Sequence, residues 1–473
     1  MRPNILSPAT NPTRWLGLTI VILALGGCAT FSKDGGFSSV ENTVREKTGK
    51  DVRWQKTDED RNAVKNRVQE ILQKPLYVDD AVQVALLNNR GLQSAFYELG
   101  ISEADLVQAG RLPNPRFSML RAKNDGEYKI EQALTFNVFS LVILPKATEI
   151  ERRRFEQTQR QVSLEVLRLA NETRKAYFTA LAADQTEKYM QQVMSAAESS
   201  AELAKRMKKA GNWSALDQAR EQSFYADATL GYARAKQVRV SAGEHLTRLM
   251  SLEEKEFQLP DRLPDLPTAT EAPGNIAQTA MQQRIDLQTM KLQTEALAKQ
   301  LGLTRTTRFI NVLELGPARV LEGRRSDPYK KGFEISFEIP LFDWGSARVA
   351  RAEAIYMQAV NQMAQTAVEA RSEVRESYSR YRTHYDIARH YRDEIVPIRQ
   401  RILEENQLRY NGMLISVFDL LADARSQVTS VNNYIESLRD FWLSQADLEM
   451  SLIGKPNFTE LGGAQMANQG ETP

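Results

Sequence analysis

The sequence has one cysteine, Cys28, and only three histidines among its 473 residues. A single thiol excludes an internal disulfide framework and a cysteine-based zinc site, and three histidines offer little for a histidine-built metal centre. Charge of one sign is also missing: 62 Lys and Arg stand against 60 Asp and Glu, which leaves no basic excess to hold nucleic acid. The sequence shows no hydrolase triad pattern, glycine-rich phosphate loop or HExxH motif. We therefore predict a protein that is not an enzyme, holds no metal and binds no nucleic acid.

The most apolar run lies near the N-terminus, where basic residues precede the segment 16–25. Its length of about ten residues suits a signal peptide and falls short of the ~20 residues of a transmembrane helix. The residues that follow, Gly26, Gly27 and Cys28, complete a sequence that resembles the lipobox of bacterial lipoproteins, in which the cysteine sulfur receives a diacylglycerol after cleavage. We expect residues 1–27 to be a lipoprotein signal peptide and Cys28 to carry the lipid. The alternative is an ordinary signal peptide with an incidental cysteine.

The two halves of the chain repeat one another, mostly at a shift of roughly 200 residues. Four matches occur in the same order: ALLNNRGLQ (85–93) with AMQQRIDLQ (280–288), LTFNV (134–138) with ISFEI (335–339), ETRKAY (172–177) with EVRESY (373–378), and Gly211 with Gly412. Chance could supply one such match, whereas four in order indicate two copies of one structural unit.

Each copy contains two segments with the two-residue period of β-strands. The stronger segments are 128–139 and 333–339, and weaker strands are expected at 116–122 and 308–315. The chain should therefore hold two hairpins, or four strands. Strands that are apolar on one side and polar on the other suit a barrel with lipid outside and water inside. The alternative is a small sheet packed on a core, but the surrounding helical sequence offers no obvious globular core.

Four strands cannot close a barrel, and open sheet edges are not tolerated in lipid. A membrane barrel would therefore need several chains, and three copies would supply twelve strands.

A long helix is expected after each hairpin, at 146–210 and 346–410, because the first stretch has neither proline nor glycine. Both should end at a glycine in the left-handed conformation, Gly211 and Gly412, and return as a second helix. A further helix is expected at 276–304, and Pro397 should kink the second long helix. Coiled-coil-like seams run along both long helices: Val162, Val166, Leu169, Thr173, Ala176 and Ala180 in the first, and Tyr378, Tyr381, Tyr385 and Ala388 in the second.

Three parts of the sequence resemble the TolC-like outer-membrane factor family, the exit ducts of tripartite efflux pumps and type I secretion systems. They are DDAVQVALLNNRGLQSA (79–95) with LVQAGRLPNP (106–115), IPLFDWGSARVARAEA (339–354) and RYNGMLISVFDLLADARS (409–426). The resemblance implies an α+β membrane protein: a homotrimer with a twelve-stranded β-barrel in the outer membrane, continuous with a long periplasmic α-helical barrel. Ala29, where an Asp would suggest inner-membrane retention, favours the outer membrane by analogy with lipoproteins.

Six segments follow from these observations. We expect the signal peptide at 1–27, an N-terminal tether or equatorial segment at 28–77, and the first repeat at 78–252. A proline-rich equatorial linker is expected at 253–274, the second repeat at 275–454, and a disordered tail at 455–473.

Candidate pore residues lie just past the turn in each copy. Asp419 and Asp423 are four residues apart, so both carboxylates share one helix face. In a trimer they would form rings of negative charge, which cation-passing pores use for selectivity. Asp217 is the counterpart of Asp419 in the first copy. The alternative is an ordinary solvated helix face.

The turns themselves are candidate docking tips. Gly211, Asn212 and Trp213 form the first, and Gly412, Met413 and Leu414 the second. Exposed apolar residues at a tip suggest contact with a partner, here the periplasmic adaptor. The alternative is packing between neighbouring helices. His384 and His390, six residues apart, do not share a helix face and are interpreted as surface residues.

The function that these features predict is an outer-membrane exit duct, which passively conducts substrates from an inner-membrane pump and its adaptor to the outside. The alternatives are a type I secretion channel, and a lipid-anchored periplasmic coiled-coil scaffold without a pore. No cofactor is expected beyond the lipid on Cys28.

Overall fold

The computed structural model describes residues 30–254, 257–270, 276–309 and 312–458. The predicted signal peptide, Cys28 and nearly all of the predicted tail lie outside these ranges. Backbone contacts divide the chain into two compact units. Unit 1 comprises Met1–Phe37, Tyr97–Gln159 and Thr289–Ala364, and unit 2 comprises Ser38–Phe96, Arg160–Gln288 and Gln365–Pro473. Each unit is described by itself.

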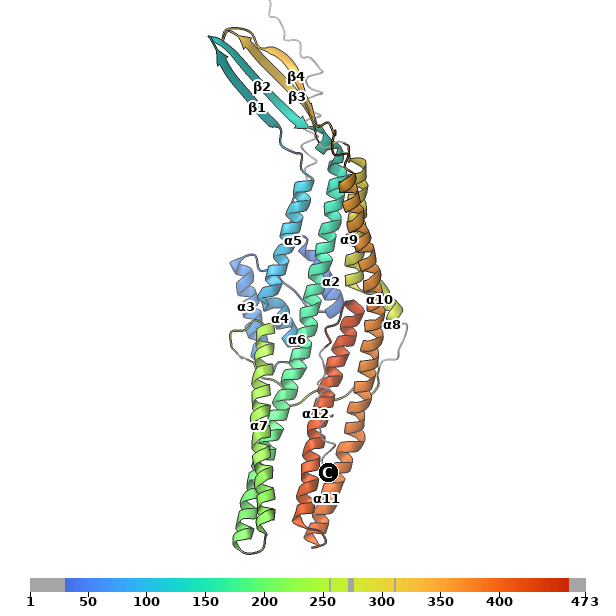
Figure 1. Cartoon of the computed structure of the whole chain (residues 1–473). Helices are drawn as coiled ribbons and strands as arrows, with labels where there is room; N and C mark the ends of the chain where they lie inside the picture. The colour runs from blue at the N-terminus through green and yellow to red at the C-terminus, as the bar shows by residue number, and fades with distance from the viewer. Residues whose placement is uncertain (1–29, 255–256, 271–275, 310–311, 459–473) are drawn as a thin grey trace, which may run out of the picture. The chain divides into compact units, whose positions relative to one another are not determined.

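Unit 1 contains one four-stranded antiparallel sheet in the order β1-β2-β3-β4 (Figure 1). The strands are β1 (Arg116–Asn124), β2 (Glu127–Asn137), β3 (Leu313–Gly323) and β4 (Lys330–Phe337). Both predicted hairpins are confirmed, and the pairing of β2 with β3 joins the two repeats in one sheet. The third strand starts at Leu313 rather than at 308, because α9 (Ile285–Thr306) runs on toward it. Threonine hydroxyls near the end of α9, at 304, 306 and 307, donate to carbonyls one turn back.

Backbone geometry restricts which residues fit at two points of the sheet. Asp125 and Gly126, with φ of 46° and 87°, form the turn between β1 and β2. Two successive positive φ values match the twist of a two-residue hairpin, and Asp-Gly is a preferred pair for it. A Cβ at Gly316 of β3 would lie 1.8 Å from the carbonyl oxygen of Leu134, so this position in the ladder accepts only glycine.

One face of the sheet carries a set of exposed apolar side chains. Neighbouring members face one another across the strands in the observed register, as Phe136, Leu315 and Ile335 do. The exposed members are Phe117, Met119, Leu134, Phe136, Leu315, Phe333, Ile335 and Phe337, with exposed fractions from 37% to 74%. Large apolar side chains this exposed, side by side, need an apolar partner.

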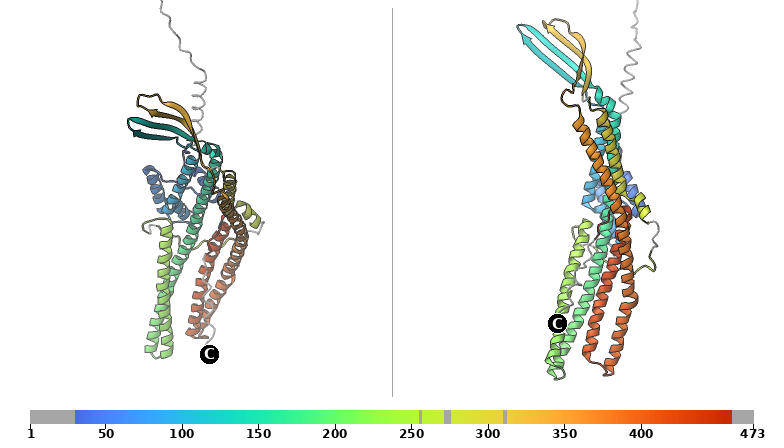
Figure 2. Two further views of the ribbon diagram at one scale, coloured as in Figure 1. Left: turned by 45° about the horizontal axis from the view of Figure 1, so that its top comes forward. Right: turned by 45° about the vertical axis from the view of Figure 1, so that its right-hand side comes forward.

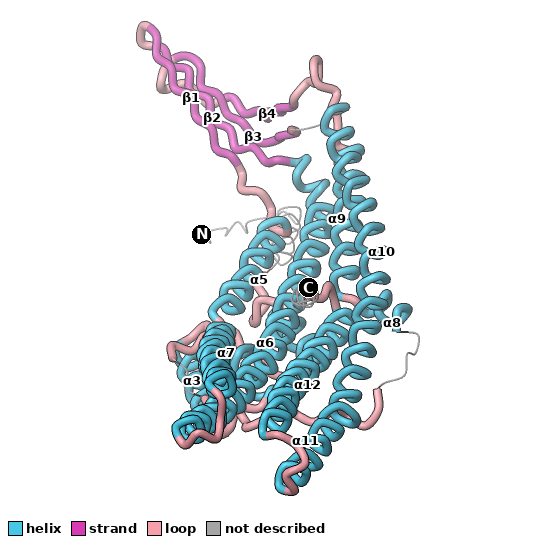
Figure 3. The backbone as a smooth tube through the Cα atoms, turned by 60° about the horizontal axis from the view of Figure 1, so that its bottom comes forward, coloured by secondary structure: helices cyan, strands magenta, loops and turns pink. Residues whose placement is uncertain are grey.

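Three long helices continue from the strands within unit 1 (Figure 3). The first part of α6 (Val138–Lys209) follows β2, α9 precedes β3, and α10 (Ser346–His390) follows β4. α6 begins at Val138, eight residues before the predicted start, with Pro145 inside it. The reason is a cap that we did not predict: the side chain of Asn137 accepts a hydrogen bond of 2.9 Å from the amide of Ser140.

Unit 2 contains α6 from Arg160 onward, together with α7 (Ala215–Leu249), α11 (Val396–Asn411) and α12 (Val417–Ile453). Both views of Figure 2 show α6 beside α7 and α11 beside α12, which makes two helical hairpins. The segment predicted as a tether holds two helices, α2 (Phe37–Thr48) and α3 (Asp58–Leu72). Each buries two valines, so this segment packs on the unit rather than only linking it.

Unit 2 has a substantial hydrophobic core, contrary to the expectation from its polar helices. The predicted seams supply much of it: Val162, Val166, Thr173, Ala176, Ala180, Tyr381, Tyr385 and Ala388 are all buried. Phe441 and Trp442 of α12 add a cluster of rings, in which Trp442 stacks on Phe178 at 5.2 Å. The core was missed because its residues are spread along helices that are polar on average, and only packing gathers them.

Short helices break at matching positions in the two repeats. α4 (Val78–Asn88) and α5 (Arg90–Ala109) meet at Asn89, and α8 (Ile276–Gln283) and α9 meet at Arg284, so the helix predicted over 276–304 is interrupted. The Asn89 side chain donates to the carbonyl of Leu249 at the end of α7, at 2.9 Å. Arg284, 1% exposed, donates to the carbonyl of Ser451 near the end of α12 and pairs with Glu373 at 2.8 Å. At each break, the side chain of Asn89 or Arg284 thus donates a hydrogen bond to a backbone carbonyl at the end of a return helix.

The predicted irregularity near Pro397 is present. The second long helix passes from α10 into a π-helical turn at Tyr391–Ile395 and resumes as α11. Proline lacks an amide hydrogen and its ring clashes with the carbonyl four residues earlier, so a wider turn just before it relieves both problems.

Candidate functional site

The candidate site is the pair of helical turns in unit 2 that hold the predicted pore and docking residues. The first turn links α6 to α7. Gly211 adopts φ of 80°, its amide bonds to the carbonyl of Lys208, and the amide of Asn212 bonds to that of Met207, each at 3.0 Å. This is the Schellman arrangement, in which a left-handed residue lets the last helical carbonyls find donors.

The second turn, from α11 to α12, has the same hydrogen bonds shifted by one residue against the predicted alignment. The amide of Met413 bonds to Tyr410 at 2.9 Å, and that of Leu414 bonds to Arg409 at 2.8 Å. Met413 has φ of 60°, whereas Gly412 has φ of −82°. The prediction that Gly412 takes the left-handed position is therefore wrong: Met413 holds it, as Gly211 does in the first turn.

All three predicted pore carboxylates lie at the start of the return helices. Asp217 and Asp419 each sit three residues after a serine N-cap, Ser214 and Ser416, whose hydroxyl accepts from the aspartate amide at 3.1 and 3.3 Å. The Asp419 carboxylate also accepts from the Ser416 amide at 3.2 Å, which completes a capping box. These carboxylates thus stabilise the helix starts, a role that we did not predict.

Asp423 lies one turn further along α12. Its carboxylate accepts a hydrogen bond from the side-chain amide of Asn406 on α11, which ties the two helices of the second hairpin together. Asp419 is exposed and Asp423 is half-buried. The structure thus brings Asp419 and Asp423 together on one hairpin, as predicted, and places Asp217 on the other.

The two tips differ in exposed apolar surface. Met413 and Leu414 are 93% and 77% exposed, so the second tip presents two large apolar side chains to its surroundings. At the first tip Gly211 and Asn212 are exposed and Trp213 is half-buried. The second tip is therefore the stronger docking candidate.

A buried carboxylate above the first tip joins the two hairpins, and sequence reasoning missed it. Glu221 of α7 is 1% exposed; it pairs with Arg425 of α12 at 2.8 Å and accepts from the Ser200 hydroxyl of α6 at 2.8 Å. The Arg425 guanidinium also lies 4.3 Å from the ring centre of Phe224. We call these residues the Glu221 cluster. A signal was present, because Glu221 precedes the buried Ala228 and Ala235 at heptad spacing and so occupies a seam position.

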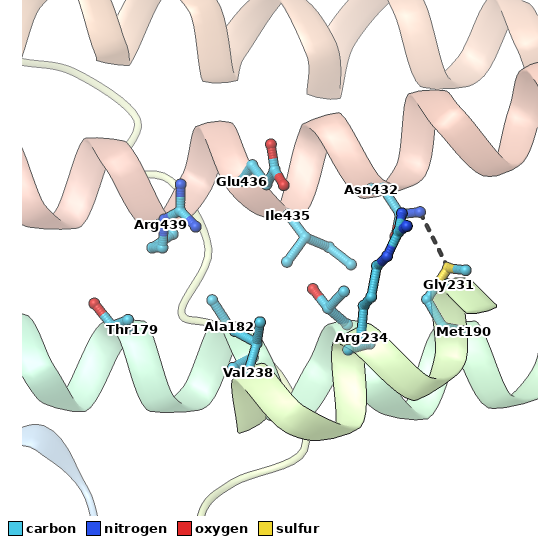
Figure 4. Close-up of a pocket in the computed structure, with 13 residues that line it drawn as sticks. Thr179, Ala182, Met190, Gly231, Arg234, Val238, Asn432, Ile435, Glu436 and Arg439 are labelled. Carbon is cyan, nitrogen blue, oxygen red and sulfur yellow. Dashed lines mark hydrogen bonds between the residues drawn. The ribbon is translucent and has the colours of Figure 1, made fainter. Parts of the chain in front are cut away.

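A cavity of about 310 Å³ lies between α6, α7 and α12. Figure 4 shows side chains from all three helices around it, among them Arg234, Glu436 and Arg439. Gly231 leaves room for the side chain of Met190. The Met190 sulfur accepts a hydrogen bond of 3.3 Å from the side-chain amide of Asn432. Most of the surface that lines this cavity is apolar.

The environments of two histidines differ. Among the described residues, no group of three or more His, Cys, Asp or Glu side chains could hold a metal ion. His390 is exposed and lies 3.3 Å from Glu394. His384, in contrast to its predicted surface position, is half-buried, and this burial lowers its pKa below the ordinary value. No helix within the described ranges has both the length and the apolar composition to cross a membrane.

This architecture is similar to that of known outer-membrane channels. A family model described as outer membrane efflux protein matches residues 276–448, which is most of the second repeat. The solved structure of CusC superposes with a TM-score of 0.67 at 18% identity, over 80% of this chain and 92% of CusC. The outer-membrane channel OprN gives 0.66 at 17% identity, over 96% and 98% of the two chains. The expected resemblance to the TolC-like outer-membrane factor family is confirmed: the fold is shared, and the outer membrane efflux protein model matches most of the second repeat.

A third solved structure, the open state of the Neisseria gonorrhoeae MtrE outer membrane channel, has a TM-score of 0.66 at 17% identity, over 80% of this chain and 89% of MtrE. No curated protein matches in sequence. At these identities the structures establish the fold of this chain, which is mostly helical with one four-stranded antiparallel sheet.

Proposed function

We propose that three copies of this outer-membrane factor form an exit duct across the outer membrane and the periplasm, through which an inner-membrane pump expels its substrates. The observation that carries the proposal is the sheet of unit 1. Its apolar side chains are exposed on one face, and each of its two outer strands, β1 and β4, has one edge that no described residue pairs with.

A barrel formed with other copies would place the apolar face against lipid and would also pair both free strand edges. In lipid every backbone donor and acceptor must be satisfied within the protein, so the free edge of β4 would pair with the free edge of β1 in the next copy. Three sheets of four strands would make a twelve-stranded barrel, with the apolar face toward lipid. The opposite face bears polar groups such as Thr135, Glu314 and Arg116, which already interact across the strands and suit a wet interior.

The helical hairpins of unit 2 would form the periplasmic part of the duct. Rings of Asp419 and Asp423 at its mouth would favour cations and narrow the opening. Asp217 would contribute a third ring. The tips, Gly211–Trp213 and Gly412–Leu414, would contact a periplasmic adaptor, with Met413 and Leu414 as the main apolar contacts.

Lipid on Cys28 would anchor the mature N-terminus in the same membrane. Each buried methylene of an acyl chain contributes ~0.8 kcal/mol, so several chains hold a protein end firmly. The barrel would be a second, independent anchor.

A test of the proposal is reconstitution of the purified full-length protein in planar bilayers. We expect a trimer that resists SDS until heated, and a small, mostly closed conductance that prefers cations. A folded, lipidated oligomer without conductance would instead favour the periplasmic scaffold. Conductance that appears only with a secretion partner would favour a type I secretion channel, which the fold serves equally well.

A further inference from the structure

Unit 1 contains a second cavity, of about 460 Å³, between α6, α9 and α10. We call it the arginine cleft. It is lined by Arg154 of α6, Leu297, Gln300 and Thr304 of α9, and Arg348, Arg351, Ala352 and Ile355 of α10. On each of the last two helices the lining residues recur at steps of three and four, so each helix presents one face to the cleft.

Positive charge in the cleft is only partly balanced. Three arginines line it, and the described lining residues include no carboxylate. Arg154 pairs with Glu151 at 2.6 Å, and Arg348 has a long pairing of 3.9 Å with Asp343, but both carboxylates lie outside the lining. Arg348 also donates to the carbonyl of Arg308 at 3.2 Å. Arg351 has no ion pair among the described residues. A cleft of this kind attracts an anion.

Two of these arginines lie near the start of α10, where Asp343 accepts from the Gly345 amide and pairs loosely with Arg348. Arg348 and Arg351 lie in the first two turns of α10, whose first turn has no acidic residue. The N-terminus of a helix carries a partial positive charge, so acidic residues are favoured there and basic ones are not. An anion bound between the two arginines would add further negative charge at this helix end, where it is favoured.

The chain next to the cleft is strongly apolar. The segment 338–345 links β4 to α10 and exposes Ile339, Leu341, Phe342 and Trp344 to fractions of 59–98%. Trp344 packs edge-on against Phe309 at 6.2 Å, and the Arg308 guanidinium lies 4.2 Å from the centre of that ring. Aromatic side chains next to arginines are typical of the boundary between the hydrocarbon and the headgroups of a bilayer.

Helix geometry puts the arginines at headgroup depth if that segment lies at the hydrocarbon boundary. With a rise of 1.5 Å per residue, Arg348 and Arg351 lie ~3 and ~8 Å along α10 from its start. The headgroup layer of one leaflet is roughly 5–8 Å thick. The arginines of α10 lie at the end of the cleft nearer the sheet, whereas Arg154 lies farther from it, because its neighbour Arg153 pairs with Glu295 of α9.

We propose that the arginine cleft binds the phosphate of an anionic phospholipid in the periplasmic leaflet of the outer membrane. The proposal rests on the membrane position of the sheet that the proposed function assigns. Arg351 holds the phosphate oxygens through its forked donors, and Arg348, which also donates to the Arg308 carbonyl, adds a second positive charge at the same end. Gln300 and Thr304 supply neutral polar groups at the same end.

The test uses the full-length lipidated protein, equilibrated with equal amounts of phosphatidylglycerol and phosphatidylcholine and then examined by native mass spectrometry. We expect retained phosphatidylglycerol on the wild-type trimer, and about tenfold less retention in Arg348→Gln/Arg351→Gln. Arg348→Lys/Arg351→Lys should fall between them, because the charge remains and the fork is lost.

The matched control is Arg152→Gln, which removes an exposed arginine from the same region of α6 but outside the cleft. Equal loss of lipid in this control would mean general charge attraction and would overturn the proposal. Displacement of the lipid by inorganic phosphate at millimolar concentration would assign the cleft to free phosphate and would overturn it as well.

Conductance and heat-modifiability are measured on the same samples. Conducting trimers that show no preference for phosphatidylglycerol would sink this inference and leave the proposed function standing. A wild-type protein that neither conducts nor forms trimers would overturn both.

Discussion

Met413 occupies at the second tip the left-handed position that Gly211 occupies at the first. Their φ angles are 60° and 80°, and the hydrogen bonds around them are equivalent. A side chain in this conformation costs of order 1 kcal/mol, because Cβ crowds the following carbonyl. The second tip bears this cost, and its Met413 side chain is 93% exposed.

Met413→Gly should therefore raise the free energy of unfolding by about 0.5–1 kcal/mol while weakening adaptor binding. Met413→Ala keeps the strained backbone and removes the same side chain, so it should weaken adaptor binding without the gain in stability. Thermal unfolding and adaptor pull-down on both variants check this. Adaptor binding that is unaffected in both variants would remove Met413 from the docking surface.

Asp419→Ala/Asp423→Ala should increase conductance and reduce cation preference, since it removes two rings of negative charge from the proposed mouth. Asp419 also belongs to a capping box, so helix fraying could give a similar result. Ser416→Ala is the control, because it removes the cap hydroxyl and keeps the charge. Single-channel recording that finds equal changes in the control and the double variant would assign the effect to the cap.

The Glu221 cluster should hold the two hairpins of unit 2 together. Arg425→Ala leaves a buried carboxylate without its cation and should destabilise the protein by about 3–5 kcal/mol. Glu221→Leu/Arg425→Leu removes both charges and should cost much less. A double-mutant cycle from thermal unfolding measures the difference, and additive effects of the two single changes would show that the pair is not coupled.

His384 should make the helical part sensitive to mild acid. Burial lowers its pKa below 6.5; nearby Asp440 opposes the shift, while Arg380 and Arg439 add to it. Below about pH 6.5 the unfolded chain therefore binds more protons at this site than the folded chain, and stability falls as the pH drops toward the lowered pKa. His384→Gln should flatten the fall in thermal midpoint across this window. A parallel pH profile in the variant would exclude His384 as the cause.

Much of the fold could be predicted because it depends on local periodicity. The strands at 128–139 and 333–339 and the seams that contain Val166 and Tyr385 follow from spacings of two and of three or four residues, which a sequence shows directly. The repeat also predicted that both halves contribute a hairpin, and β2 and β3 join them.

Features that depend on contacts between distant residues could not be predicted. Arg284 is buried because its guanidinium meets Glu373 and the end of α12, far along the chain. The Glu221 cluster joins three helices, and the shift that puts Met413 in place of Gly412 depends on hydrogen bonds within the turn.

The sequence by itself determined the repeat, the alternating strands and the long amphipathic helices, because each follows from the period at which apolar residues recur. Only the tertiary structure decided which charges are buried and paired, which residue bears the strained turn, and where three arginines of two helices line one cleft. The buried charges and the cleft depend on side chains that are distant in the chain and that meet only when the helices pack, whereas the strained turn depends on which backbone hydrogen bonds close it.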